Sequence, residues 1–173
     1  MINIEFLKRV LCMKLNKFFL FKTLLIGISL LIANPSSYGQ NINPNFDSTL
    51  AKTLGGDDFG MKKYILVMLK TGSNNMADKV TRDSLFKLHL KNIGRLADSG
   101  KLIVAGPLGK NDRSYRGIFI LNVTSLDEAQ ELLQTDPAVE QKLLEAELFQ
   151  WYGSAALPEY LKSHKKIEKY SPG

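Results

Sequence analysis

Cysteine, histidine and tryptophan are scarce in this chain. Its 173 residues include one cysteine, Cys12, one tryptophan, Trp151, and two histidines, His89 and His164. A single cysteine cannot form an intrachain disulfide, and the two histidines lie far apart, without the spacing of a metal site. We therefore expect no metal and no cofactor, and a fold that is stabilised by its apolar core.

Motifs for phosphate binding and covalent catalysis are also missing. The segment GPLGKN, residues 106–111, lacks the spacing of a phosphate-binding loop and the Ser or Thr that follows its lysine. No serine lies in the tight turn that exposes the nucleophile of a hydrolase. The sequence therefore argues against nucleotide hydrolysis and covalent catalysis.

An excess of positive charge is confined to the N-terminus. The formal net charge is +6, but residues 1–39 hold five of the 23 Lys and Arg residues and one of the 17 acidic residues. This leaves 18 basic and 16 acidic residues in the rest of the chain. Such a balance requires no polyanion, and we expect no nucleic-acid partner.

Residues 1–39 have the layout of a secretory signal peptide. A basic start precedes the uncharged run Thr23–Asn34, and small residues, Ser37 and Gly39, follow it. They place the cleavage site between Gly39 and Gln40. We expect a periplasmic or secreted protein whose true start is Met1 or Met13.

Cleavage would leave no stable membrane span. The uncharged run has twelve residues, fewer than the roughly 18 apolar residues that indicate a spanning helix. An uncleaved anchor is the alternative, because Phe18–Phe21 extend the apolar run across Lys22.

The remaining residues predict one α+β domain. Residues 40–60 lack a sustained period and indicate a linker or N-terminal arm. Residues 61–155 form the domain, and residues 156–173 form a basic tail, solvated and with at most one frayed helix. Strands are predicted at residues 64–69, 101–106, 118–123 and 146–152. A first helix is predicted from its cap at Thr81 to Gly100. A second helix follows the capping box of Ser125 and Glu128, and a short helical turn follows Asp136.

This order, β-α-β-β-α-β, is the ferredoxin-like arrangement, an antiparallel sheet with both helices on one face. A sheet with one solvated face should alternate apolar and polar residues. Yet YILVML, LIVA and IFIL are apolar at consecutive positions. Both faces are therefore expected to be covered, either by sheet-to-sheet homodimerisation, which we favour, or by the N-terminal arm or the tail.

Two polar residues stand where chemistry is possible. His89 shares a helical stripe with Leu85, Ile93 and Leu96, so its imidazole should point at the sheet. It is either a hydrogen-bonded core histidine or an acid–base group at the edge of a pocket. Asp136 precedes Pro137, the pattern of a helix N-cap, and its carboxylate either only caps the helix or also orients the histidine.

The runs HLKNIGRLADSGKLIVAGPLG, RGIFIL, SLDEAQELLQTDPAV and WYG resemble the YCII-related (YciI-like) domain family. The resemblance covers residues 61 to about 155. It implies a ferredoxin-like fold, dimers formed through the sheets, and a histidine and an aspartate that suggest an enzyme, here His89 and Asp136. Some members remove halide from chlorinated aromatic intermediates, and related dimeric α+β barrel proteins include muconolactone isomerases.

Four further residues are candidates for substrate binding, each with a structural alternative. Gly106 and Pro107 end the second strand, and the resemblance allows their backbone to border the pocket. Arg116 lies in a hairpin that could close over an anion, although a solvated turn charge explains it as well. Trp151 is expected either in a pocket wall or in the core.

Two functions follow from these expectations. The first is a cofactor-free enzyme in which His89 and Asp136 form an acid–base pair that acts on a small organic substrate, with isomerisation, elimination or dehydrohalogenation as the reaction class. The alternative is a non-catalytic exported module, which binds a small ligand or serves as a structural dimer.

Overall fold

The computed structural model describes residues 42–75 and 78–170. The predicted signal peptide, its cleavage site and the two possible start residues lie outside the described residues. The chain divides into two units, Met1–Phe46 and Asp47–Gly173. In the first unit the described residues form a turn, in which the amide of Phe46 donates to the carbonyl of Asn43 at 3.0 Å.

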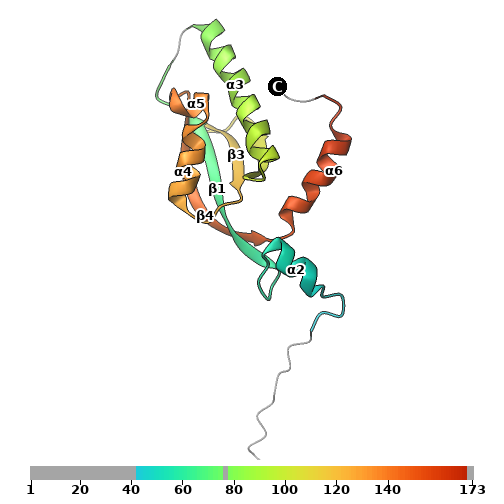
Figure 1. Ribbon diagram of the computed structural model, residues 1–173. Helices are drawn as coiled ribbons and strands as arrows, with labels where there is room; N and C mark the ends of the chain where they lie inside the picture. Colours follow the sequence, from blue (N-terminus) through green and yellow to red (C-terminus); the bar gives the residue numbers. More distant parts are fainter. Residues whose placement is uncertain (1–41, 76–77, 171–173) are drawn as a thin grey trace, which may run out of the picture. The chain divides into compact units, whose positions relative to one another are not determined.

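The second unit contains a four-stranded antiparallel sheet in the order β2-β3-β1-β4, and helices α3, α4 and α5 cover one of its faces (Figure 1). This topology confirms the predicted ferredoxin-like α+β fold. In chain order the elements are α2 (Ser48–Leu54), β1 (Met61–Thr71), α3 (Lys79–Asp98), β2 (Leu102–Pro107), β3 (Tyr115–Leu121), α4 (Leu126–Gln134), α5 (Pro137–Glu140), β4 (Leu144–Ser154), the 3-10 helix η1 (Leu157–Glu159) and α6 (Tyr160–Ile167).

The main core lies between the sheet and helices α3, α4 and α5. Alternate residues of β1 point toward the helices, and Ile65, Val67 and Leu69 are each at most 3% exposed. Leu96 of α3 and Leu133 of α4 close over them, each 1% exposed. Burial of such side chains stabilises the fold by about 1.5–3 kcal/mol each. This apolar core stabilises a domain that has no disulfide among its described residues.

The start of α3 differs from the prediction. The N-cap is Asp78, whose carboxylate accepts the amides of Val80 and Thr81, so the predicted cap, Thr81, lies inside the first turn. Asp78 and Thr81 are both good N-cap residues and compete for the start of the helix. The carboxylate of Asp78 has the geometry to accept hydrogen bonds from two backbone amides. Gly100 follows the helix with φ +70°, the left-handed conformation that its predicted place requires.

The strand centres are predicted well and the strand ends less well. β1 and β4 pair along their whole length, from Met61 opposite Ser154 to Thr71 opposite Leu144, and both extend past the predicted ranges. Backbone pairing rather than hydrophobicity determines these ends, where polar residues also lie. The second strand ends one residue later than predicted, because Pro107 still pairs with Gly117.

The C-terminal tail contains helical turns that contact the sheet. η1 and α6 occupy residues that were predicted as a solvated tail, and Leu157 and Leu161 pack on the outer face of the sheet. The Tyr160 hydroxyl donates to the carbonyl of Ile103 on the edge strand β2. The predicted arm likewise contains a helix, α2, which has no buried residue. One of the two alternatives for covering the outer face, the tail, therefore accounts for part of it.

Candidate active site

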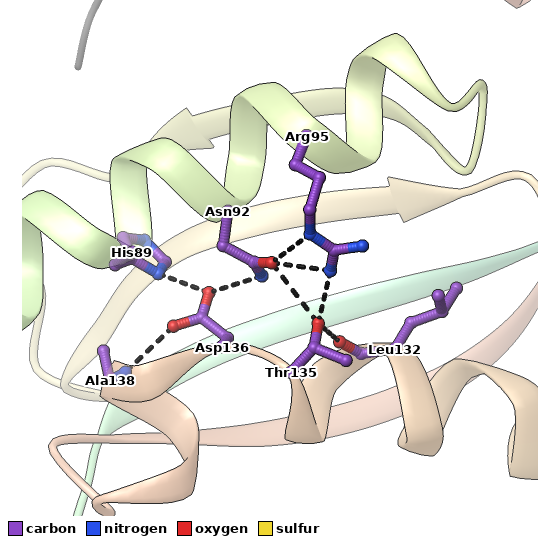
Figure 2. Close-up of polar contacts among 7 residues, drawn as sticks. All are labelled: His89, Asn92, Arg95, Leu132, Thr135, Asp136 and Ala138. Atoms are coloured by element: carbon purple, nitrogen blue, oxygen red, sulfur yellow. Dashed lines mark hydrogen bonds and ion pairs between the residues drawn. The ribbon is translucent and has the colours of Figure 1, made fainter.

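The histidine and the aspartate that the sequence singled out lie in direct contact. His89 Nδ1 is 2.6 Å from Asp136 Oδ2 (Figure 2). The long helix α3 presents the imidazole on its inner face, and the short helix α5 presents the carboxylate at its N-cap. The two side chains are 11% and 1% exposed, so water weakens their interaction little.

Asp136 serves the helix cap and the histidine with different oxygens. Oδ1 accepts the amide of Ala138 at 2.9 Å, which caps α5, while Oδ2 faces His89. Pro137 takes the first helical position, where its missing N–H costs nothing. Asp136 therefore both caps α5 and contacts the histidine, so the two interpretations do not exclude each other.

Three residues that the sequence analysis missed continue the network. Asn92 is 7% exposed and its amide nitrogen lies 3.5 Å from Asp136 Oδ2. The guanidinium of Arg95 donates twice to Asn92 Oδ1, at 3.1 and 2.7 Å, and once to Thr135. These bonds turn the NH₂ group of Asn92 toward the carboxylate (Figure 2). The spacing of three residues between His89 and Asn92, which places both on one side of a helix, was the available signal.

Aromatic rings fix the plane of the imidazole. The ring of Phe119, on β3, stacks on His89 with centroids 6.0 Å apart and an interplanar angle of 22°. Phe86, one turn earlier on α3, meets it edge-on at 6.1 Å. With Nδ1 engaged by Asp136, Nε2 is the ring nitrogen that remains to meet a ligand.

A pocket of about 700 Å³ opens beside this imidazole, between α3 and the ends of β2 and β3. Its wall is mainly apolar and includes both phenylalanines. Two arginines, Arg82 and Arg116, also line it, and no Asp or Glu does among its described lining residues. The polar side chains of the wall are Thr71, Asn74, Asn75, Arg82, His89 and Arg116.

Three of the four predicted binding residues lie on this pocket. Gly106, Pro107 and Arg116 line it, and Arg116 Nε donates to Thr71 Oγ1 at 2.6 Å. Trp151, for which a pocket wall and the core were the two alternatives, lies outside the lining. It packs against Tyr64 on the outer face of the sheet, with centroids 5.7 Å apart. Strand alternation is the reason: Trp151 pairs with Tyr64 and shares its face, whereas the pocket lies on the other.

The described residues contain neither a metal-ligand cluster nor a helix that could span a membrane. In residues 42–75 and 78–170, no three His, Cys, Asp or Glu side chains cluster as metal ligands would. Over the same ranges, no helix has the length and apolar character needed to cross a membrane.

The family model of the YCII-related domain matches residues 64–152, just over half of the chain. The protein belongs to the YCII-related domain family. The match begins in β1, ends in β4 and includes both His89 and Asp136, so the site described above lies wholly within the family domain. The resemblance that the sequence motifs indicated is thereby confirmed.

Two further comparisons add little about function. A comparison with curated proteins found no match. One solved structure to which part of the chain is similar is 5-chloro-2-hydroxyhydroquinone dehydrochlorinase from Burkholderia phenoliruptrix AC1100, in complex with 2,5-dihydroxybenzoquinone. The two chains are 20% identical, with a TM-score of 0.37, over 50% of this chain and 92% of that chain. A likeness at this level says nothing about the substrate of the YCII-related protein.

Proposed function

We propose that this YCII-related protein is a cofactor-free enzyme in which His89 is the general acid–base catalyst and Asp136 its positioning residue. One observation carries the proposal: the 2.6 Å contact of His89 Nδ1 with a buried carboxylate, in the wall of a pocket of about 700 Å³. A histidine that only filled the core would not need an adjoining cavity of ligand size. The apolar wall and the two arginines favour a small organic anion as substrate.

The contact with Asp136 sets the chemistry available to the imidazole. An ionised Asp136 accepts a hydrogen bond from the Nδ1–H group of His89. The lone pair of the ring is then on Nε2, on the side of the pocket. Nε2 then takes a proton from an acidic C–H of the substrate, and Asp136 stabilises the imidazolium that forms. Return of the proton to another carbon completes an isomerisation. Loss of a leaving group such as halide completes an elimination, after which the imidazolium releases its proton to water.

Hydrogen exchange tests this proposal before the natural substrate is known. Small organic acids and phenols that raise the melting temperature would be incubated with the protein in D₂O. We expect at least one bound compound to take up deuterium at its acidic carbon, followed by NMR, because a base at Nε2 exchanges its proton with solvent.

The control for this exchange blocks the pocket and leaves the acid–base pair in place. Ala105 is exposed and lines the pocket, so Ala105→Phe should abolish both binding and exchange. If compounds bind in a manner that Ala105→Phe prevents, and none of them exchanges, the pocket is a binding site and the catalytic proposal is wrong.

The proposal includes export of the enzyme. The basic start, the uncharged run Thr23–Asn34 and the small residues Ser37 and Gly39 support cleavage before Gln40. We expect intact-mass spectrometry of the protein expressed with its own N-terminus to show a chain that begins at Gln40, outside the cytoplasm. A full-length chain in the cytoplasmic fraction would contradict this.

The proposal also includes a homodimer formed through the outer face of the sheet. η1 and α6 cover the end of this face near Tyr64, whereas Leu66, Met68 and Ile118 are partly exposed and Phe149 is 48% exposed. Apolar side chains on three adjacent strands form a surface that a second copy would bury. At the other end of the outer face, Lys70 Nζ and the Tyr115 hydroxyl both donate hydrogen bonds to the Glu147 carboxylate, at 3.0 Å each. These bonds hold the pKa of the Glu147 carboxyl below its usual value.

Phe149→Asp tests this interface. We expect the wild-type protein to be a dimer in light scattering after size-exclusion chromatography, and Phe149→Asp to be a monomer, because the new carboxylate would be buried without a partner. Leu126→Asp is the control, since Leu126 is 43% exposed at the start of α4, away from this face. A monomeric wild type, or a Phe149→Asp variant that remains dimeric, would show that this surface is not the interface.

A further inference from the structure

Helix α3 carries an apolar stripe that the described part of the domain does not bury. Phe86 and Leu90 are each 37% exposed, and Ile93 and Ala97 continue the stripe at helical spacing as partly buried residues. The stripe runs beside His89, since Phe86, Leu90 and Ile93 line the same pocket as the imidazole. A stripe of this kind needs an apolar partner.

A groove runs along the same stripe. Its volume is about 830 Å³, and its walls come from α3 and α6. The Lys165 ammonium and the Asp98 carboxylate, 2.9 Å apart, join the two helices at one end. The apolar part of the α3 wall consists of Leu90, Ile93, Gly94 and Ala97, and Leu161 is the apolar residue of α6 in the lining. Charged side chains also line the groove, namely Lys91, Arg95, Asp98, Lys162, Lys165 and Glu168.

The groove and the active-site pocket adjoin. Leu90 and Ile93 line both cavities, so one apolar surface leads from the imidazole of His89 to the space under α6. The pocket end has Arg82 and Arg116 and is suited to an anionic group, whereas the shared wall is apolar. The combined shape is that of a site for an elongated amphipathic molecule.

We propose that the ligand of this site is a long-chain organic acid. Its anionic head lies in the pocket beside Arg116, with the acidic C–H at His89, and its flexible apolar tail runs over Leu90 and Ile93 into the groove under α6. This inference rests on the proposed function, because the head is the part on which His89 acts. It adds the tail, which a compact aromatic or small acid lacks.

A chain-length series tests the tail. We would titrate the full-length protein with butanoate, octanoate and dodecanoate in a calorimeter. Burial of a methylene group is worth about a two- to fourfold gain in association constant. We therefore expect affinity to rise from butanoate to octanoate by that factor for each methylene that enters the groove, and to level off once the groove is filled.

Gly94 offers a matched pair of variants. It lies in the middle of α3, it lines the groove and not the pocket, and a Cβ added there meets no atom within 4 Å. Gly94→Phe should fill the groove and Gly94→Ala should leave it open. Both changes suit an exposed helical position, so both variants are expected to fold.

Four results decide the proposal. Gly94→Phe should remove the gain of octanoate over butanoate and leave butanoate binding unchanged, and Gly94→Ala should behave as the wild type. The proposal is overturned if affinity is independent of chain length, if none of the three acids binds, or if Gly94→Phe leaves the octanoate gain intact.

These results are distinguishable from a failure of the proposed function. A compact acid that exchanges its C–H proton while chain length has no effect would leave the acid–base site standing and remove the tail. A chain-length effect that Gly94→Phe abolishes, together with no exchange by any bound acid, would leave the ligand class and remove the catalysis.

Discussion

Replacing His89 with glutamine is expected to lower the turnover, or the deuterium exchange, of a bound acid by about 10²–10⁴-fold, the usual contribution of positioned proton transfer. Glutamine has a similar size and retains a donor for Asp136 Oδ2, but its amide cannot take up a proton at neutral pH. The loss should therefore appear mainly in kcat, with KM changed little, because the arginines to which we assign binding of the anion remain in place. The measurement is a comparison of steady-state rates for the two proteins.

Melting temperature and ligand affinity are the controls for this variant. His89→Gln should keep its fold and bind the same compounds, since the pocket wall is otherwise unchanged. A variant that binds normally and turns over at the wild-type rate would remove His89 from the mechanism.

Replacing Asp136 with alanine is expected to have the largest effect on stability. The carboxylate is 1% exposed and interacts with Ala138, His89 and Asn92. Loss of a helix cap costs about 1 kcal/mol, and loss of a buried charge-assisted hydrogen bond costs about 1.5–3 kcal/mol. We therefore expect the free energy of unfolding to fall by about 2–4 kcal/mol.

Urea unfolding at one fixed protein concentration measures this change. Ser125→Ala is the matched control, because Ser125 caps α4 through the amides of Asp127 and Glu128 and should cost only the cap, about 1 kcal/mol. Equal losses in Asp136→Ala and Ser125→Ala would mean that Asp136 does no more than cap its helix.

Asp136→Asn should retain the helix cap through Oδ1 and lose activity. An amide NH₂ group in place of Oδ2 cannot accept a hydrogen bond from the Nδ1–H group of His89.

Local patterns predicted the fold and two of the five residues of the hydrogen-bond network, His89 and Asp136. The stripe that places His89 on the inner face of α3 depends only on helical spacing, and Asp136-Pro137 indicates an N-cap from local chemistry. That the two side chains meet depends on how α3 packs on α5, which no local pattern states. Asn92 was missed because an asparagine on a helix usually faces solvent; only the packed helices show that Arg95 holds it inward.

Trp151 shows a different limit of the sequence. Alternation along β4 places Trp151 and Phe149 on one face and Gln150 and Leu148 on the other. A sheet with apolar residues on both faces gives no indication of which face the helices cover. The pocket could therefore not be assigned to one face before the structure, and the choice between pocket wall and core stayed open for Trp151.

The tautomer of His89 tests the central claim most directly. Nitrogen-15 NMR of the labelled protein distinguishes a protonated ring nitrogen from one with a lone pair. The contact of Nδ1 with the Asp136 carboxylate predicts a proton on Nδ1, and the proposed role as base requires a lone pair on Nε2 and a shift of the Nε2 resonance when an organic acid binds. A proton on Nε2, or an Nε2 resonance that bound acids leave unchanged, would contradict the assignment of this nitrogen as the base.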